Sequence, residues 1–347
     1  MTEYPLDIII PVWNRPLEVR AALASFVSAS PQARLVLVNN GSERETESIL
    51  DEFAEALDDH ALLVATDRNI GSVAALNFGL SKSTAPLILL TSPFTRVESG
   101  WFTSAASLFG QYPDAGSVVL RKNRGSSVTA SVEVDHGCFD AMIVRRSLYD
   151  AIGGIAESMD GGEWALRDFA RRALVLNYKT FSLQTRHINF LEQVKLGSAA
   201  LREERIRHAR ASYVNLWGEP ETFLLHCPES LFGLNIAELK GALLQSARQG
   251  NRLIVTAEHK VAKILSKNGL STIHENLTLQ PLPRFFAGKY LGKAVKLAAI
   301  VNPLTTIVAD SAVFDSKLRT ISFSDFMSQL QQHSEHYYHG RTLDRIN

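Results

Sequence analysis

Short apolar runs alternate with amphipathic stretches through the first part of the 347-residue chain. The runs are rich in β-branched residues, as is typical of strands buried on both faces. The expected strands are Leu6–Val12, Arg34–Val38, Ala61–Ala65 and Pro86–Leu90. The stretches between them carry apolar residues at helical spacing, over Leu17–Ser28, Glu43–Leu57 and Asn69–Leu80. This alternation predicts a mostly parallel sheet with helices on both faces.

Each expected strand ends in a polar or proline-containing loop. These loops begin at Trp13, Asn39, Asn69 and Thr91. Ligands of such sheets bind outside the carboxyl ends of the strands, so we expect the four loops to converge on one crevice. We also expect Ser42 to cap the helix that follows the second loop.

The alternating pattern restarts after Gly218-Glu219-Pro220. Strand-like runs lie at Thr222–His226, Arg252–Thr256, Thr305–Phe314 and Arg319–Phe323, and helical patterns at Ile236–Arg248, Glu258–Lys267 and Phe285–Ile300. Domains average roughly 150 residues, so a chain of this length is expected to hold two. We predict a first domain over 1–218 and a second, smaller α/β Rossmann-like domain over 219–347, which ends in a polar tail.

Composition and charge exclude several classes of protein. The chain is 46% hydrophobic and 21% charged, and its 36 Lys and Arg balance its 36 Asp and Glu. We therefore expect no nucleic-acid partner, because a uniform basic field is missing. Two cysteines, Cys138 and Cys227, make neither a disulfide framework nor a metal cluster. The sequence shows neither a leader pattern nor a long apolar span, which favours a cytoplasmic protein.

Two features of the second half leave alternatives open. Lys289, Lys293 and Lys296 follow one face of the helix expected at 285–300. Such a helix could make peripheral contact with an anionic membrane, or it could cover a sheet with its lysines in solvent. The histidines of the tail could hold a metal, although a solvated tail explains them equally. They are His333, His336 and His339.

Residues 1–218 resemble glycosyltransferase family 2, which has the GT-A fold. Six pieces follow the family's order and spacing: IIIPVWNRP, LVNNGS, RNIGSVAALNFGL, DHGCFDAMIVRRSLYDAIGG, GGEWALRDFARRA and YVNLWG. The resemblance implies transfer of a sugar from a nucleotide-diphosphate sugar donor to a glycan or glycolipid acceptor, in polysaccharide or glycoconjugate synthesis. Family 2 inverts the anomeric carbon, so we expect an inverting transferase.

One departure from the family concerns its metal. In the family, aspartates at the end of the fourth strand hold a divalent cation, Mg or Mn, against the pyrophosphate. This chain has Thr91-Ser92-Pro93-Phe94 there. We therefore expect metal-independent or metal-atypical transfer and assign no metal ligand. A lysine or arginine could take the role of the cation, or these residues could be plain surface charge. The candidates are Arg96, Arg121, Lys122 and Arg124.

The resemblance also implies a set of residues that bind the nucleotide sugar. For several of them, turn and capping chemistry is the alternative. The set consists of Pro11, Val12, Trp13, Asn14, Asn39, Asn69, Gly71, Asn77, Ser92 and Arg96.

The family's catalytic base corresponds to Glu163, at the start of the helix that follows Gly161-Gly162. A carboxylate at that position can also be an ordinary helix N-terminal acid. Asp135 is the second candidate for the base, and His136 and Gly137 border the acceptor side. His187 matches a family histidine that sometimes joins the metal, although a structural role is equally consistent with a lone histidine.

Two rival functions remain open on the sequence. The first is a non-catalytic sugar-nucleotide or glycan-binding module in a polysaccharide-assembly complex. The second is a nucleotidyltransferase, which needs a glycine-rich phosphate loop that the WNRP segment does not supply. The donor sugar, the acceptor and the linkage are not indicated.

Overall fold

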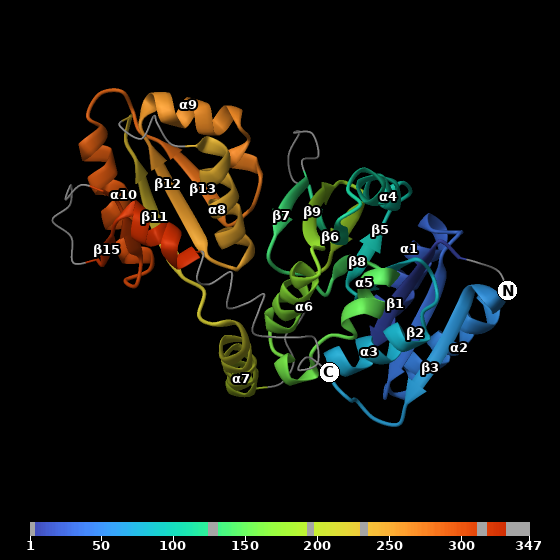
Figure 1. Cartoon of the computed structure of the whole chain (residues 1–347). Coiled ribbons are helices and arrows are strands. Elements are labelled where there is room, and N and C mark those ends of the chain that lie inside the picture. The colour runs from blue at the N-terminus through green and yellow to red at the C-terminus, as the bar shows by residue number, and fades with distance from the viewer. Residues whose placement is uncertain (1–3, 124–130, 193–197, 230–234, 311–317, 331–347) are drawn as a thin grey trace. The chain divides into compact units, whose positions relative to one another are not determined.

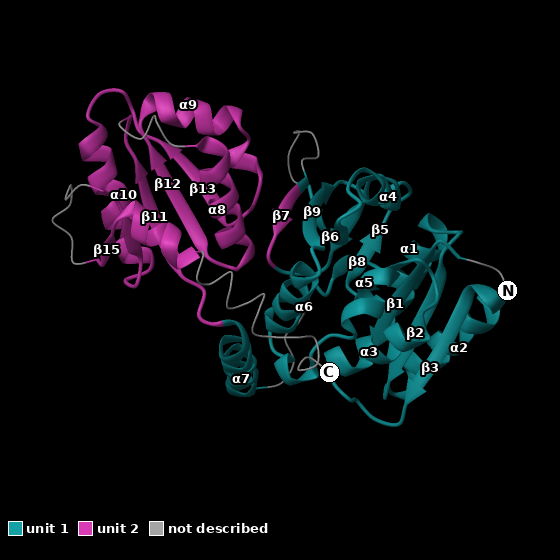
Figure 2. Cartoon of the chain, in the orientation of Figure 1, with its two compact units in different colours: residues 1–131, 136–217 teal, residues 132–135, 218–347 magenta. Residues whose placement is uncertain are grey.

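A computed structural model describes residues 4–123, 131–192, 198–229, 235–310 and 318–330 (Figure 1). The chain forms two compact units, one of residues 1–131 and 136–217 and the other of residues 132–135 and 218–347 (Figure 2). Each unit has its own sheet and its own buried core. Arg124 and the histidines of the tail lie outside the described residues.

The sheet of the first unit is mostly parallel, as the sequence predicts. Its strands are β1 (Leu6–Val12), β2 (Arg34–Asn40), β3 (Ala61–Thr66), β4 (Leu87–Thr91), β6 (Ala115–Lys122), β8 (Ala141–Arg145) and β9 (Lys179–Thr185). They run in the order β3-β2-β1-β4-β8-β6-β9. β1 is parallel to β2 and β4, and β6 is parallel to β9. β8, by contrast, is antiparallel to both of its neighbours, β4 and β6.

Helices pack on both faces of this sheet, because successive side chains of a strand point to opposite faces. Ile8 and Ile10 of β1 join a core that includes Phe26. Ile9 points the other way, and a methyl group on Gly79 would lie 2.4 Å from its Cγ2 atom. Gly79 therefore lets α3 lie directly on the strands. The helices are α1 (Pro16–Ala29), α2 (Arg44–Leu57), α3 (Ser72–Lys82), α4 (Trp101–Gln111), α5 (Arg146–Ile152), α6 (Trp164–Val175) and α7 (Ala199–Trp217).

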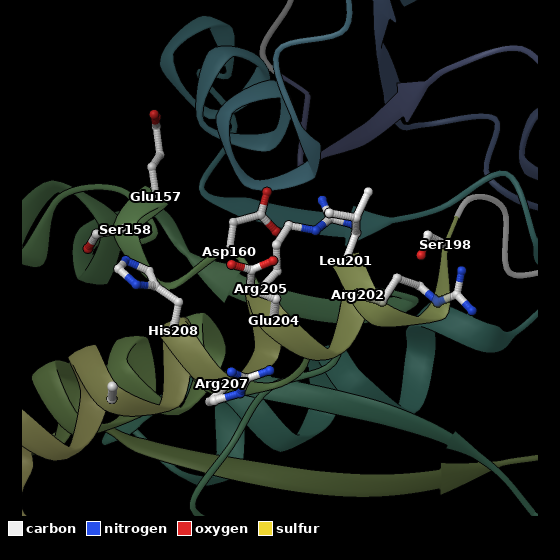
Figure 3. A pocket seen from close by; sticks show the side chains of 11 residues that line it. Glu157, Ser158, Asp160, Ser198, Leu201, Arg202, Glu204, Arg205, Arg207 and His208 are labelled. Atoms are coloured by element: carbon white, nitrogen blue, oxygen red, sulfur yellow. The ribbon is translucent and has the colours of Figure 1, made fainter.

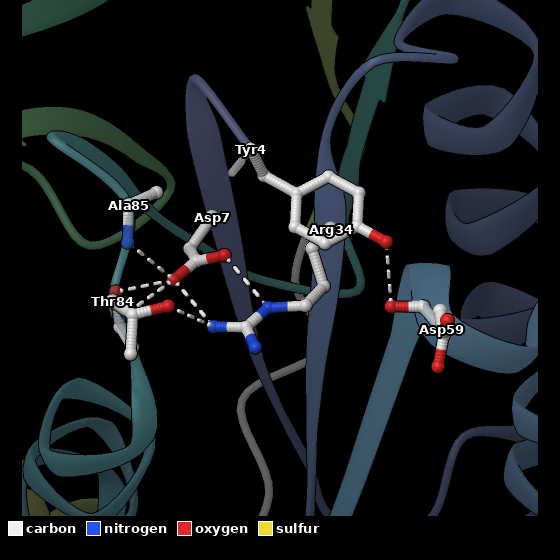
Figure 4. A network of polar contacts seen from close by, with 7 residues as sticks. Tyr4, Asp7, Arg34, Asp59, Thr84 and Ala85 are labelled. Carbon is white, nitrogen blue, oxygen red and sulfur yellow. Dashed lines mark hydrogen bonds and ion pairs between the residues drawn. The ribbon is translucent and has the colours of Figure 1, made fainter. Parts of the chain in front are cut away.

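A buried ion pair joins β1 to β2 (Figure 4). Asp7 is fully buried, and its two carboxylate oxygens accept hydrogen bonds of 2.9 and 2.8 Å from the guanidinium of Arg34. The hydroxyl of Ser83 and the backbone N–H groups of Thr84 and Ala85 also donate to this carboxylate. Burial alone would raise the pKa of Asp7, but these donors outweigh it and lower the pKa. Asp7 and Arg34 lie opposite each other in the register of β1 and β2, so the pair supports this register.

The second unit is a parallel α/β sheet of Rossmann-like type. Its strand order is β13-β12-β11-β14-β15, and every neighbouring pair is parallel. The strands are β11 (Thr222–Cys227), β12 (Arg252–Ala257), β13 (Leu277–Pro281), β14 (Thr306–Val308) and β15 (Thr320–Ile321). β13 was not predicted from the sequence, and β14 and β15 are shorter than their predicted ranges. Within the described residues of the chain, no helix has both the length and the apolar character needed to cross a membrane.

Both faces of this second sheet are covered. Phe223 and Leu225 of β11 pack into one core, whereas Leu224 packs into another on the opposite face. The first core includes the buried sides of α8 (Ile236–Arg248) and α9 (His259–Lys267). The second includes the buried side of α10 (Ala287–Val301), which starts two residues later than its sequence pattern indicates.

The segment 132–135, most of which belongs to β7 (Ser131–Val134), groups with the second unit. The carboxylate of Glu133 accepts two hydrogen bonds, of 2.6 and 2.7 Å, from the guanidinium of Arg248. The backbone N–H of Glu133 donates to the carbonyl of Ile273. The two units are therefore not two uninterrupted stretches of chain.

Candidate functional site

A crevice of about 490 Å³ opens at the carboxyl ends of β1 and β4 in the first unit. Pockets of this size are typical of small-ligand sites. Three of the loops expected to converge do line it, through Trp13, Asn69 and Thr91. At the end of β2 the lining residue is Asn40, not Asn39. The crevice therefore lies at the sheet edge where α/β proteins bind ligands.

The loop after β1 supplies an apolar wall. Pro11, Val12 and Trp13 line the crevice, as the resemblance implies for the nucleoside contact. The Trp13 side chain is 47% exposed. An indole that is half open to solvent can offer its face to a flat aromatic ligand.

Asn14 shapes this loop from outside the crevice. It has a left-handed backbone with φ of 58°, a conformation that asparagine tolerates better than most residues. Its Oδ1 accepts the N–H of Glu43, and its own N–H donates to Oγ of Ser42. The Ser42 hydroxyl donates to the carbonyl of Val12. The expectation that Ser42 caps α2 is wrong, because the N-cap residue is Glu43 and its side chain makes no capping bond.

A cluster of amides forms the adjoining wall. Nδ2 of Asn40 donates to Oδ1 of Asn69 over 3.2 Å, and both residues line the crevice. Oδ1 of Asn69 also accepts the N–H of Gly71, whose φ of 100° favours glycine. Asn39 is buried behind this wall, and its Oδ1 accepts the N–H of Ser42. Asn40 is buried too, and its amide also bonds backbone groups, since its Oδ1 accepts the N–H of Ile70 and its Nδ2 donates to the carbonyl of Gly71.

Five of the ten proposed nucleotide contacts do not line the crevice, namely Asn14, Asn39, Gly71, Asn77 and Arg96. The amide of Asn77 bonds both backbone groups of Ile155, with two hydrogen bonds of 2.8 Å. The guanidinium of Arg96 donates to the carbonyls of Pro93 and Glu18. Both side chains hold loops together.

The acceptor-side residues of the sequence analysis are also placed elsewhere. Asp135 is buried and groups with the second unit. The ring of His136 lies 3.4 Å from a guanidinium nitrogen of Arg121. Gly137 is needed for packing, because a methyl group there would lie 2.5 Å from the sulfur of Met142. None of these residues lines the crevice.

The floor of the crevice joins the end of β4 to the start of β8. The Ser92 hydroxyl donates to Oδ1 of Asp140 over 3.0 Å, and the Thr91 hydroxyl donates to the Asp140 carbonyl over 2.7 Å. Thr91 pairs with Ala141 in the antiparallel register of these strands. A carboxylate therefore stands beside the position where the family's aspartates were expected. Asp140 could not be placed there from the sequence, because an apolar run does not reveal the direction of its strand.

The neighbouring thiol is not a reactive group. Burial raises the pKa of Cys138, and the nearby charge of Asp140 raises it further. The thiol therefore stays protonated at neutral pH and is a poor nucleophile and a poor metal ligand.

Glu163 occupies the start of α6 but does not line the crevice. Its Oε1 accepts a hydrogen bond of 2.9 Å from Nε of Arg167, and the Glu163 side chain is half exposed. The segment just before it does line the crevice, through Asp160, Gly161 and Gly162. The carboxylate that lines the crevice next to α6 is thus Asp160 and not Glu163, and Asp160 was not predicted from the sequence.

Helix α7 contributes positively charged side chains to one wall of the crevice. Arg202 and Arg205 lie three residues apart on α7 and line the crevice together with Arg15. Arg202 and Arg205 also line a second hollow of about 870 Å³, which includes His208 (Figure 3). Asp160 is common to both hollows. The crevice therefore continues past the arginines and Asp160 into a second space along α7.

These arginines differ from the cations that the sequence suggested. Arg96 and Arg121 bond within the fold, as described above, and Lys122 is exposed and does not line the crevice. Among the described residues, the cationic side chains that line the crevice are Arg15, Arg202 and Arg205.

The side chains around the crevice can supply few ligands to a metal ion. Within the described part of the chain, no group of three or more Asp, Glu, His or Cys ligands gathers there. His187 is exposed and does not line the crevice. Mg²⁺ on a nucleotide commonly uses only one or two protein carboxylates together with phosphates and waters. Asp140, beside Ser92, fits such a single-carboxylate role.

Comparison with known proteins shows what the first unit is similar to. Residues 7–175 match the model of the family described as glycosyl transferase family 2. The undecaprenyl-phosphate 4-deoxy-4-formamido-L-arabinose transferase of Klebsiella pneumoniae is 28% identical over 199 residues, which are 50% of this chain and 60% of that protein. The protein of the same description from Photorhabdus laumondii is 27% identical over 88 residues, 24% of this chain and 27% of that protein. This chain thus spans less than two thirds of each relative.

Among solved structures, a crystal structure of GalNAc-T7 with UDP, GalNAc and Mn²⁺ superposes with a TM-score of 0.52 at 11% identity. The match covers 62% of this chain and 48% of that one. At this identity the likeness shows the fold. The first unit is therefore glycosyltransferase family 2-like and has the GT-A fold, as its sequence motifs predict.

Proposed function

We propose that this protein is a glycosyltransferase that moves a sugar from a nucleoside-diphosphate sugar to a glycan or glycolipid acceptor. The observation that carries the proposal is the composition of one crevice. It combines a half-exposed indole, two amides, two carboxylates and three arginines at the carboxyl ends of the central strands. The family match and the named relatives support the same class of reaction.

The nucleoside part of the donor would lie against Pro11 and Trp13. Asn69 offers an amide group that can bond a base or a ribose, and Asn40 holds it in place through its hydrogen bond to Oδ1 of Asn69. Ser72, the first residue of α3, also lines the crevice. Backbone N–H groups at a helix N-terminus favour anions, so the phosphates would lie on that side.

Charge on the departing diphosphate would be balanced by arginine. A guanidinium forms paired, charge-assisted hydrogen bonds to phosphate. Arg15 approaches from the loop after β1, and Arg202 and Arg205 approach from α7. This arrangement supports transfer that is metal-independent or that uses metal in an atypical way.

A divalent cation, when bound with the donor, would be held by Asp140 and would add further neutralisation of the phosphates. The Ser92 hydroxyl orients the carboxylate of Asp140 for this task. The three arginines and a cation held by Asp140 would therefore contribute separately to donor binding. Removal of the cation by a chelator distinguishes the two contributions.

The proton of an acceptor hydroxyl would be taken by Asp160. This carboxylate lines both hollows, so it lies where a donor in the crevice and an acceptor along α7 would meet. The hydroxyl oxygen attacks the anomeric carbon, Asp160 accepts the proton, and the nucleoside diphosphate leaves. Direct displacement inverts the anomeric configuration. Glu163, the base suggested by the sequence, is the competing candidate.

The first test is a thermal-unfolding screen of the full chain with UDP-, GDP-, CMP- and dTDP-sugars, each in EDTA and in Mn²⁺. A ligand present at about 100 times its dissociation constant adds about 2.7 kcal/mol of stability. We expect one donor class to stabilise the protein in both conditions. Stabilisation by none of them would contradict the proposal.

Turnover then separates an enzyme from a binding module. The stabilising donor is incubated with polyprenyl-phosphate and glycan acceptors, because the named relatives act on undecaprenyl phosphate. Release of nucleoside diphosphate that depends on an acceptor supports the transferase. Binding without turnover across the acceptor panel would favour a non-catalytic sugar-nucleotide module.

A further inference from the structure

The outer surface of α10 in the second unit carries a concentration of exposed apolar side chains. Its inner side, formed by Leu291, Val295 and Ala298, is buried in the core of the second sheet. This spacing of four and three residues fixes which side of the helix faces outward. The orientation of α10 is therefore set by its own packing.

Seven of the 13 large hydrophobic residues that are exposed within the described chain lie between positions 285 and 304. Ile300 is 78% exposed and Leu304 is 84% exposed. The seven are Phe285, Phe286, Tyr290, Leu297, Ile300, Val301 and Leu304. Scattered single residues of this kind are ordinary, but a cluster of them marks an interaction surface.

Lysines share the outward side of the helix with this cluster. Lys289, Lys293 and Lys296 are exposed and follow the same four-and-three spacing as the buried residues. Tyr290, Leu297 and Val301 form the neighbouring stripe, and Nζ of Lys293 lies 5.4 Å from the ring centre of Tyr290. The exposed side of α10 is thus a lysine stripe beside an apolar stripe.

The charge of this region is one-sided. Residues 276–309 contain Arg284 and the three lysines but no Asp or Glu, although the whole chain has no net charge. Phe285 and Phe286 begin the surface, and Phe286 takes a left-handed backbone with φ of 63° at the helix start. Both aromatic side chains are exposed at the N-terminal end of α10.

We propose that this surface, residues 284–304 with the outward side of α10, docks on an anionic lipid bilayer. Apolar and aromatic side chains would enter the boundary between headgroups and acyl chains, and the lysines would extend to the headgroup phosphates. An interface with another protein is disfavoured, because lysine is depleted in protein interfaces. The inference does not depend on transferase activity.

The test is co-sedimentation of the full-length protein with phosphatidylcholine vesicles that contain either no anionic lipid or about one third phosphatidylglycerol, as charge attraction requires. We expect binding to the anionic vesicles that weakens as salt is added. Lys289→Gln, Lys293→Gln and Lys296→Gln together should weaken it at least tenfold.

A matched control removes an equal number of lysines from α9 in the same unit, as Lys260→Gln, Lys263→Gln and Lys267→Gln. These side chains are exposed but lie beside no apolar stripe. This control should bind like the wild type. Equal loss in both triple variants would overturn the proposal, because any cluster of lysines would then suffice.

A second pair of variants tests insertion. Leu297→Ser with Ile300→Ser removes two exposed side chains, so the thermal unfolding midpoint should be unchanged while vesicle binding falls. Leu297→Trp should gain fluorescence quenching by brominated lipid, and Lys263→Trp on α9 should not. Absence of vesicle binding by the wild type would overturn the proposal. So would a wild-type dimer, seen by light scattering, that the double serine variant dissociates.

Discussion

The hydroxyl of Ser92, just after β4, donates a 3.0 Å hydrogen bond to Oδ1 of Asp140, just before β8. The two residues are brought together because β8 runs antiparallel to β4, so that the start of one strand meets the end of the other. The bond holds a carboxylate beside the end of β4, where the segment Thr91-Ser92-Pro93-Phe94 has no acidic residue of its own. This geometry is the basis for separating metal-assisted from arginine-assisted donor binding.

Asp140→Asn should weaken donor binding in Mn²⁺ and leave it nearly unchanged in EDTA. The amide oxygen can still accept the Ser92 bond, so the loss isolates the charge. We expect a loss of about tenfold, or about 1.4 kcal/mol, by isothermal titration. Asp51→Asn, at an exposed site on α2, serves as the control. Equal affinity of wild type and variant in Mn²⁺ would show that Asp140 holds no ion.

Asp160→Asn should lower kcat by about 10²–10⁴-fold with a hydroxyl acceptor, because a general base contributes on that scale. Glu163→Gln should have little effect, since its carboxylate only pairs with Arg167 at a half-exposed site. The measurement is acceptor-dependent release of nucleoside diphosphate under saturating donor.

The fold of both variants is checked by thermal unfolding, because Asp160 also accepts a long hydrogen bond of 3.5 Å from the N–H of Val73. A large kcat loss in Glu163→Gln with an active Asp160→Asn would reverse the assignment and restore the base suggested by the sequence.

Trp13→Ala should reduce donor affinity by about tenfold, as stacking of an aromatic side chain on a base is worth about 1–3 kcal/mol. The side chain is half exposed, so the free energy of unfolding should change little. Leu17→Ala, at a residue that is 80% exposed and does not line the crevice, is the control. If both variants bound the donor as the wild type does, the nucleoside would have to lie elsewhere.

Asp7→Asn should destabilise the first unit by about 3 kcal/mol at neutral pH, because it removes the buried charge that pairs with the partly buried guanidinium of Arg34. The pKa of Asp7 is lowered by folding, so the unfolded chain binds the proton first as pH falls. The stabilisation is therefore complete above the unfolded pKa of about 3.9 and is lost as pH falls through the lowered folded value. Urea unfolding of both proteins at neutral and acidic pH measures this difference. A difference that did not shrink in acid would contradict the account.

Much of the fold could be predicted from the sequence because buried strands and amphipathic helices leave periodic patterns. The helix expected at 236–248 is α8, residue for residue. Strand direction could not be predicted in the same way. An apolar run of a few residues reads identically in either direction, so the antiparallel β8 and the site residue Asp140 were missed.

The hydrogen-bond and ion-pair partners of the candidate site residues were also not predicted from the sequence. Glu163 lies at the predicted helix start, but Arg167 lies one turn later and donates a hydrogen bond to the Glu163 carboxylate. That i, i+4 spacing was visible in the sequence and could have warned against a catalytic role. The arginines of α7 had no such signal, because their helix is polar on most sides and only the fold shows which side faces the crevice.

The most direct test of the central claim is the affinity of the stabilising donor for Arg202→Ala with Arg205→Ala, measured by isothermal titration in EDTA. Arg44→Ala, at an exposed position that does not line the crevice, is the matched control. A charge-assisted hydrogen bond contributes about 1.5–3 kcal/mol, so the double variant should lose about 100-fold or more. The control should bind as the wild type does. Unchanged affinity in the double variant would contradict the account, because the diphosphate would then not lie against α7.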